Sequence, residues 1–257
     1  VPDRLPAELR GVLKQFEPGV IQLEVGIQTF SQEVAALISR RQRYDQLESN
    51  LRFLREETGV HLHTDLIVGL PGETEESFAA GFDRLVAMNP HEIQVGMLKR
   101  LRGAPISRHT DSYGLVFHPC APYEILQTSS IDFKSMQRMR RFSQVWDRVG
   151  NRGYFGDTAQ LLWANSSPYQ AVMRYALWIF ETMGRTHSIS LNRLTRSLFD
   201  YLTQVLGEDQ GIVGRQMAKD VARRTKGNLP GFLMPWKSEQ GHQGPSSSMP
   251  RQARHQS

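Results

Sequence analysis

The sequence predicts an α/β fold in which about three βα units come first and an α-helical domain follows. Over the first hundred residues, short runs of strand-forming residues alternate with amphipathic stretches of helical periodicity. This alternation stops near Ser107, and only helical periodicity is found beyond it. Three βα units make up about half of an eight-stranded parallel barrel, or the core of an open doubly wound sheet. We expect domains at 1–107 and 108–237, and a disordered tail rich in Gly, Ser, Gln and Pro at 238–257.

The first expected βα unit begins with a strand over residues 20–28, whose sequence is VIQLEVGIQ. Apolar residues then recur with helical spacing over 33–39 and 45–58, which predicts two helices. Asp45, with Glu48 three residues later, is typical of a capping box at the start of the second helix.

The second expected strand spans residues 61–68 and runs directly into a glycine-rich loop at 69–73. Thr74 is expected to be the N-cap of the next helix, because its hydroxyl can accept a hydrogen bond from a backbone N–H of the first helical turn. That helix is expected to end before Asn89, and the third strand to span 92–98.

The remaining chain predicts a helical domain after a Gly/Pro-rich linker at 109–123. Gly184 is expected to end the second of its helices as a C-cap. The expected helices span 132–149, 168–183, 190–206 and 213–225. We interpret one basic face of the first helix as solvent-exposed, and it consists of Arg138, Arg140, Arg141 and Arg148.

Composition excludes several classes of protein. With 39% apolar and 22% charged residues, and no apolar run of roughly 18 residues or more, we expect a globular protein with no membrane span. The N-terminus at Val1 carries no signal-peptide pattern, which predicts a cytoplasmic protein. Cys120 is the one cysteine, so this chain alone supports neither a disulfide nor a multi-cysteine metal site. No P-loop, HExxH or nucleophile-elbow motif supports an NTPase or hydrolase.

Positive charge gathers in the C-terminal part of the chain. Residues 211–257 hold eight basic and two acidic side chains, a balance of +6, whereas the whole chain has a net charge of +5. We interpret this stretch as a solvated basic helix and tail, because no base-reading motif accompanies it. Nucleic acid is therefore a less favoured partner.

Polar residues on or just after the three strands are the candidate site, because ligands of parallel βα folds gather at the carboxyl ends of strands. They are Glu24, Gln28, Asp65, Glu73 and Gln94. His61 and His63 lie two residues apart and point to the same side of one strand, but without a third ligand we interpret them as packing or surface residues.

Four ordered stretches resemble the later half of a radical S-adenosylmethionine (SAM) barrel, a partial TIM-type barrel. They are LEVGIQTF at 23–30, ISRRQ at 38–42, HLHTDLIVGLPGET at 61–74 and EIQVGMLKRLRG at 92–103. The order and spacing are similar to the cobalamin-binding radical SAM proteins with a helical C-terminal domain of unknown function. The start of that domain is matched by APYEILQTSSIDF at 121–133.

The resemblance implies SAM and a [4Fe-4S] cluster as cofactors, possible use of cobalamin, and a 5'-deoxyadenosyl radical that abstracts hydrogen from a substrate. By similarity to members like coproporphyrinogen oxidase, Gln28, Arg40 and Asp65 would touch SAM, and the loop from Gly69 to Gly72 would pass near the adenine. In the usual pattern of the fifth strand the glutamate falls at Gly72, so Glu73 is displaced by one.

The CxxxCxxC motif that binds the cluster in this family is absent from the sequence, so no metal ligand is assigned within it. The resemblance therefore implies the C-terminal portion of a radical SAM enzyme, with the missing N-terminal region of the same protein as its partner and a substrate that the sequence does not reveal. Two alternatives stay open at this point. One is a non-catalytic remnant or protein-binding module, and the other is an RNA-modifying enzyme that uses the basic C-terminal stretch.

Overall fold

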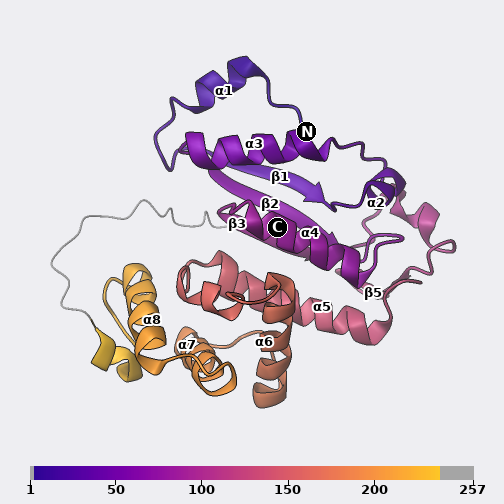
Figure 1. Ribbon diagram of the computed structural model, residues 1–257. Coiled ribbons are helices and arrows are strands. Elements are labelled where there is room, and N and C mark those ends of the chain that lie inside the picture. Colours follow the sequence, from indigo (N-terminus) through magenta and orange to yellow (C-terminus); the bar gives the residue numbers. More distant parts are fainter. Residues whose placement is uncertain (1–2, 238–257) are drawn as a thin grey trace.

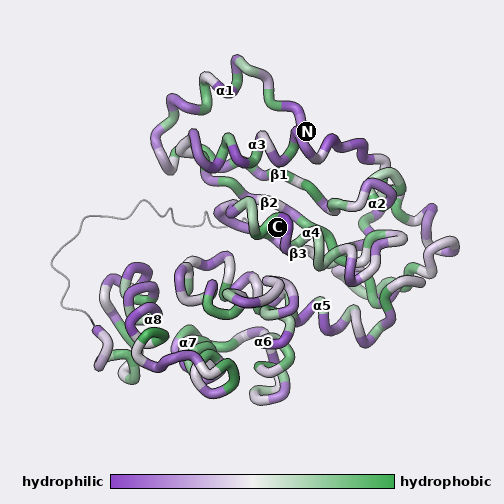
Figure 2. The backbone as a smooth tube through the Cα atoms, in the orientation of Figure 1, coloured by the Kyte–Doolittle hydropathy of each residue, from purple (hydrophilic) through white to green (hydrophobic). Residues whose placement is uncertain are grey.

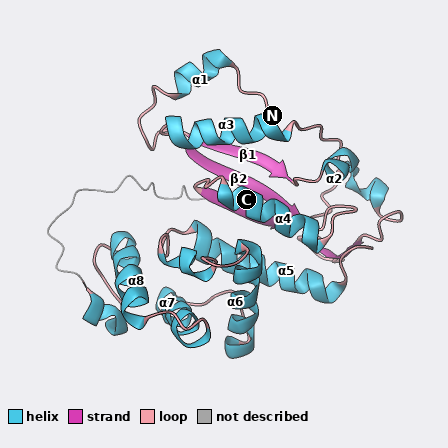
Figure 3. Cartoon of the chain, viewed as in Figure 1, coloured by secondary structure: helices cyan, strands magenta, loops and turns pink. Residues whose placement is uncertain are grey.

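A three-stranded parallel sheet is followed by a helical part in the computed structural model, which describes residues 3–237 (Figures 1 and 3). The strands pair in the order β1-β2-β3, and they are β1 (Gln22–Gln28), β2 (His61–Val68) and β3 (Glu92–Met97). The helices of this part are α1 (Ala7–Leu13), α2 (Gln32–Leu37), α3 (Tyr44–Glu57) and α4 (Glu75–Ala87). The expected α/β fold, with about three βα units of a partial TIM-type barrel, is confirmed.

The helical part begins after a short antiparallel pair, β4 (Val116–Phe117) and β5 (Ile125–Gln127). Its helices are α5 (Phe133–Trp146), α6 (Pro168–Met183), α7 (Leu191–Asp200) and α8 (Gln210–Thr225). One π-helical turn, which we call the wide turn of α5, extends that helix over Asp147–Asn151. Another π-helical turn extends α7 over Tyr201–Val205. Short 3-10 helices lie at Pro105–His109, Thr158–Leu162 and Gly231–Trp236.

The sheet has one apolar and one polar face. Helices α3 and α4 cover the apolar face (Figure 1), where Leu62 and Leu66 of β2 are buried. The register aligns His63 with Glu92 and Asp65 with Gln94 across β2 and β3. Because side chains alternate along a strand, these four polar residues all lie on the second face. We call it the inner face.

Side chains of α5 and its wide turn occupy the free edge of β3. The side-chain amide of Asn151 accepts from Ile93 N at 3.0 Å and donates to Ile93 O at 2.9 Å. Trp146 Nε1 donates to the same carbonyl at 2.8 Å, and Ser143 Oγ donates to Val95 O at 3.0 Å. These bonds take the place of a neighbouring strand, and they satisfy backbone groups that an uncovered edge leaves without partners.

One buried apolar cluster runs from the sheet into the helices. Phe82 of α4 lies edge-on to Phe142 and Trp146 of α5, at ring centroid distances of 5.0 and 4.8 Å, and Tyr169 of α6 packs against Phe142 at 4.6 Å. Hydrophobic and hydrophilic residues alternate along the longer helices in Figure 2, and α3, α4, α5 and α6 each bury apolar residues at helical spacing. Aromatic pairs of this kind stabilise a core beyond the area that they bury.

Several sequence expectations are met at their residues and others are wrong. β2 and α6 have the expected bounds, Thr74 accepts from Ser77 N at 3.1 Å as the N-cap of α4, and Gly184 ends α6 with a φ of 68°. The capping box at Asp45 is wrong, because α3 begins one residue earlier and its N-cap, Arg43, makes no side-chain cap. The buried Tyr44 draws that first turn inward, since its hydroxyl donates to Thr29 O at 3.0 Å.

The expected tail at 238–257 lies outside the described residues. No helix within residues 3–237 is long and apolar enough to cross a membrane.

Candidate functional site

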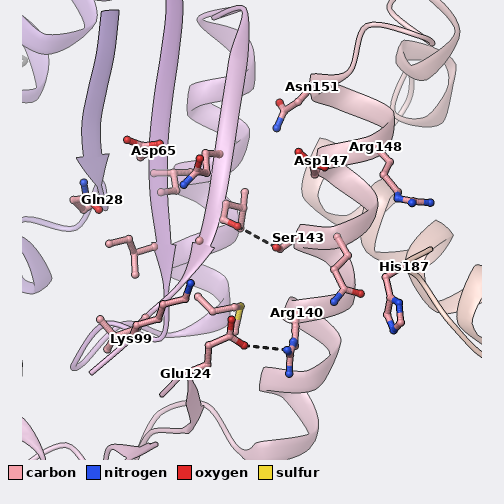
Figure 4. Close-up of a pocket in the computed structure, with 18 of the residues that line it drawn as sticks. Gln28, Asp65, Lys99, Glu124, Arg140, Ser143, Asp147, Arg148, Asn151 and His187 are labelled. Atoms are coloured by element: carbon pink, nitrogen blue, oxygen red, sulfur yellow. Dashed lines mark hydrogen bonds and ion pairs between the residues drawn. The ribbon is translucent and has the colours of Figure 1, made fainter. Parts of the chain in front are cut away.

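A cavity of about 1040 Å³ lies between the inner face of the sheet and α5 (Figure 4). The sheet contributes Gln28, Asp65 and Gln94 to its lining. The opposite wall is a polar stripe at helical spacing along α5 and its wide turn, made by Arg140, Ser143, Gln144, Asp147, Arg148 and Asn151. Apolar residues on the other side of α5 are buried in the core, so the helix has one face for packing and one for the cavity.

Gln28 ends β1 at an irregularity of the strand, with a φ of 73°. Its side chain folds back over Gly26, because Gln28 Nε2 lies 2.5 Å from the position that a Cβ on Gly26 would occupy. Only glycine leaves room for this arrangement. Among the described residues, no hydrogen-bond partner reaches the buried Gln28 Oε1. A buried acceptor of this kind at a cavity wall suits a ligand that can donate to it.

Arg40 lies beside the same end of β1 and donates from Nη1 to Gly26 O at 2.5 Å. Together with Gln28 it lines a second cavity of about 390 Å³ on the other side of the Gln28 side chain. Gln28 therefore lies in the wall between the two cavities, with Asp65 on one side and Arg40 on the other. All three residues lie near the carboxyl end of β1, where Asp65 of the neighbouring strand β2 pairs in register with Gly26.

Asp65 presents a partly exposed carboxylate to the large cavity, with 26% of its side chain accessible. His63 lies behind it on the same strand, with Nε2 3.2 Å from Asp65 Oδ1. Gln94 of β3 is the register partner of Asp65 and lines the same cavity.

The loop after β2 has the glycine conformation that its sequence indicates, but its two glycines line neither of these two cavities. Gly69 and Gly72 have φ values of 88° and 78°. A Cβ on Gly69 would lie 2.7 Å from Ile125 Cγ2, and one on Gly72 would lie 3.3 Å from Tyr113 and from Leu37. These glycines thus permit close packing against β5 and its neighbours, and from this loop it is Leu70 that lines the smaller cavity.

Glu73 is buried at the end of this loop, with 1% of its surface exposed. Thr29 Oγ1 donates to its Oε1 at 2.6 Å, while Oε2 is buried and has no hydrogen-bond partner within residues 3–237. Burial raises the pKa of Glu73 to about 7, and the hydrogen bond from Thr29 opposes this only in part. The carboxyl group fastens the end of β1 to the loop after β2.

Sequence reasoning missed the helical wall of the cavity. The expected solvent-exposed arginine face is met at Arg140, which is exposed, whereas Arg138, Arg141 and Arg148 are half-buried. Each of the four arginines has a partner. Arg140 pairs with Glu124 at 3.1 Å, Arg138 with Glu75 at 3.1 Å, Arg141 lies over the ring of Phe180, and Arg148 donates to Ile189 O. The spacing of polar residues from Arg140 to Asn151 is the signal that could have indicated this second polar face.

No group of three or more His, Cys, Asp or Glu side chains within residues 3–237 is arranged to hold a metal ion, and Cys120 is exposed. The residues of this chain therefore do not fit an iron-sulfur cluster, whose usual ligands are cysteine thiolates. They do fit SAM, since the unpartnered Gln28 Oε1, the Asp65 carboxylate and the Arg40 guanidinium border adjoining cavities.

Comparison with known families assigns both parts of the chain. Residues 3–85 match the radical SAM superfamily, and residues 111–256, more than half of the chain, match the protein of unknown function DUF4080. The chain belongs to the DUF4080 family. The N-terminal part of this DUF4080 protein is similar to the radical SAM superfamily over residues 3–85.

Curated relatives match the DUF4080 protein over a short region. Anaerobic coproporphyrinogen III oxidase 1 of Cereibacter sphaeroides is 35% identical over 80 residues, which cover 31% of this chain and 18% of the relative. Oxygen-independent coproporphyrinogen III oxidase of Escherichia coli is 36% identical over 77 residues, which cover 30% of this chain and 17% of the relative. Ribosomal protein uS12 methylthiotransferase RimO of Phocaeicola vulgatus is 33% identical over 81 residues, which cover 30% of this chain and 18% of the relative.

Among solved structures, coproporphyrinogen III oxidase (HemN) from Escherichia coli, described as a radical SAM enzyme, covers 42% of the DUF4080 protein. The match covers 24% of that enzyme, with 29% identity and a TM-score of 0.37. For the three curated relatives described above, the match to the DUF4080 protein spans less than a fifth of the relative's length.

Proposed function

We propose that this chain binds SAM at the carboxyl end of its sheet and forms the SAM-side and substrate-side part of a radical SAM enzyme. The observation that carries the proposal is the convergence of Gln28, Arg40 and Asp65 on two adjoining cavities, with Gln28 in the wall between them. The cluster ligands of the working enzyme would come from residues outside 1–257, since this chain has one cysteine.

The chemistry of the three side chains suits different groups of SAM. The Arg40 guanidinium presents planar donors that match a carboxylate, and the Asp65 carboxylate accepts from ribose hydroxyls or an amino group. Gln28 Oε1 is a further acceptor that no described residue uses. When bound to a reduced [4Fe-4S] cluster, SAM supplies hydrogen-abstraction chemistry.

The α5 wall would then face the substrate. It lines the same cavity as Asp65, it carries both charged and amide groups, and it belongs to the part of the chain that matches DUF4080. These features support a polar substrate held between the sheet and α5. Cobalamin use stays a prediction, which the cobalt content of the full-length protein purified from cells supplied with cobalamin would test.

We expect Asp65→Asn and Arg40→Met each to weaken binding of SAM to this chain about tenfold or more, since each removes a charge-assisted hydrogen bond worth roughly 1.5–3 kcal/mol. Isothermal titration calorimetry measures the dissociation constant, and urea unfolding checks that the variants fold. Arg41→Met is the matched control, because the exposed Arg41 follows Arg40 and lines neither the large cavity nor the 390 Å³ cavity. Unchanged affinity in both Asp65→Asn and Arg40→Met would contradict the proposed site.

A catalytic role of the whole protein has its own test. The full-length protein, reconstituted with iron and sulfide and reduced without oxygen, should form 5'-deoxyadenosine from SAM. Failure to bind iron or to cleave SAM would favour the alternative of a non-catalytic binding module. RNA binding that weakens steeply with salt would favour the RNA-modifying alternative.

A further inference from the structure

A buried row of histidines and carboxylates crosses the inner face of the sheet behind Asp65. Glu92 of β3 lies between two histidines of β2, with its Oε1 3.1 Å from His61 Nε2 and its Oε2 3.8 Å from His63 Nδ1. The other ring nitrogen of His63, Nε2, lies 3.2 Å from Asp65 Oδ1. The row therefore ends at the carboxylate that lines the large cavity.

His63 has a carboxylate oxygen next to each of its ring nitrogens. A neutral imidazole carries a hydrogen on only one nitrogen, so one of the two carboxylates would then face a lone pair. The imidazolium form carries a hydrogen on both and turns each contact into an attractive one. The geometry of β2 and β3 thus favours the charged form of His63.

Burial strengthens the attraction between these charges once they are paired. The side chains of His63 and Glu92 are only 5% and 4% exposed, so water screens neither charge. An ionised carboxylate is costly to bury unless a cation is close to it, and an imidazolium between Glu92 and Asp65 serves both at once. The partly exposed Asp65 then keeps one oxygen for His63 and has the other for the cavity.

We infer that His63 is a positioning residue that acts as an imidazolium between Glu92 and Asp65 and holds the Asp65 carboxylate oriented at the cavity. This inference deepens the proposed function, because the ligand that Asp65 meets is SAM only if that proposal holds.

His61 provides a matched control within the same row. It lies two residues before His63 on the same strand and the same face, and it contacts the same carboxylate, Glu92, but it makes no ion pair with Asp65 within the described residues. Its outer side stacks on His91 at a ring centroid distance of 4.7 Å. Burial, together with the nearby Arg55, lowers the pKa of His91 to about 4, so His91 stays neutral near pH 7.

The first experiment reads the protonation of His63 directly. Nitrogen-15 NMR of the histidine rings in this chain, assigned by comparison with His63→Gln, should show His63 protonated on both nitrogens at pH 7.5. Glu92→Gln removes one flanking charge and should move the signals of His63 toward the neutral form at that pH. A neutral His63 in the wild-type chain at pH 7.5 would overturn the inference. The titration must be read against the charged and titratable groups around His63, which are Glu24, His61, Asp65, His91 and Glu92.

The second experiment measures SAM affinity by calorimetry as a function of pH. His63→Gln keeps a side-chain donor but no charge, and we expect it to weaken SAM binding about tenfold at pH 7, as the loss of one charge-assisted interaction would. The wild type should lose affinity as rising pH deprotonates His63, whereas His63→Gln should show no such loss. His61→Gln should stay within about threefold of wild type and keep its pH profile. Equal affinity in His63→Gln and wild type, both folded by circular dichroism, would overturn the positioning role.

The two proposals fail in different ways. If wild type and all variants fail to bind SAM, the proposed function is wrong, and the NMR experiment alone then decides whether His63 is the imidazolium partner of Asp65. If the wild type binds SAM but His63 is neutral, the proposed function stands and the inference about His63 is overturned.

Discussion

Replacing Asn151 with leucine should lower the free energy of unfolding by about 3 kcal/mol, because it leaves a buried backbone donor on β3 without a partner. The amide of Asn151 bonds both Ile93 N and Ile93 O, and Asn151 is 9% exposed. Trp146 still donates to Ile93 O in the variant, but the described structure offers Ile93 N no second acceptor. Leucine has nearly the same size, so the loss reports the hydrogen bonds more than the packing.

Urea unfolding followed by circular dichroism measures this change as a shift in midpoint at constant slope. Ser143→Ala is the graded control, since it removes one bond to Val95 O and should cost about 1 kcal/mol. A loss below 1 kcal/mol in Asn151→Leu would show that α5 does not hold the edge of β3 as described.

Replacing Glu73 with glutamine should stabilise the protein at pH 8 by about 3 kcal/mol and leave it unchanged near pH 4. Burial raises the pKa of Glu73 from 4.5 to about 7, so between these values the folded chain holds a proton that the unfolded chain has released. The stability that Glu73 contributes is therefore fully present below pH 4.5, falls as pH rises, and is lost above pH 7. Glutamine is neutral at every pH and can still accept from Thr29.

Unfolding in urea at pH 4, 6 and 8 gives the profile. The difference between the variant and the wild type should grow over this range. Glu76→Gln is the matched control, because Glu76 lies three residues on and is exposed. Its pKa is lowered by hydrogen bonds to a backbone amide and to Thr74, so its replacement should bring no gain at pH 8. Equal stability of Glu73→Gln and wild type at pH 8 would show that the carboxyl group is not desolvated.

Local signals explain which elements the sequence could predict. β2 is a run of strand formers between Gly59 and Gly69, and α6 lies between Ser167, which caps it, and Gly184, so the pattern indicates both with their bounds. α3 starts where the buried ring of Tyr44 meets Thr29, a contact between residues 15 apart that no local pattern contains.

In the candidate site too, local motifs predict some of the residues, whereas others depend on tertiary packing. Gln28, Arg40 and Asp65 follow from motifs near the strand ends, and the structure brings them to adjoining cavities. The glycines at 69 and 72 follow from the same motif, but Ile125 and Tyr113 occupy the space beside them, and that depends on the later part of the chain. The α5 wall and the Glu92–His63–Asp65 row require the pairing of β2 with β3 and the docking of a helix, neither of which spacing alone determines.

The shared aromatic cluster limits how evolution or an engineer can exchange parts of this molecule. Phe82 lies in the part that matches the radical SAM superfamily, yet Phe142, Trp146 and Tyr169 of the DUF4080 part pack around it. In a chimera joined between β3 and α5, α4 would come from one parent and α5 and α6 from the other, so their aromatic side chains would not be complementary in packing. The unit of recombination is therefore α4 together with α5 and α6, and a graft meant to bring a new substrate wall must carry its own α4.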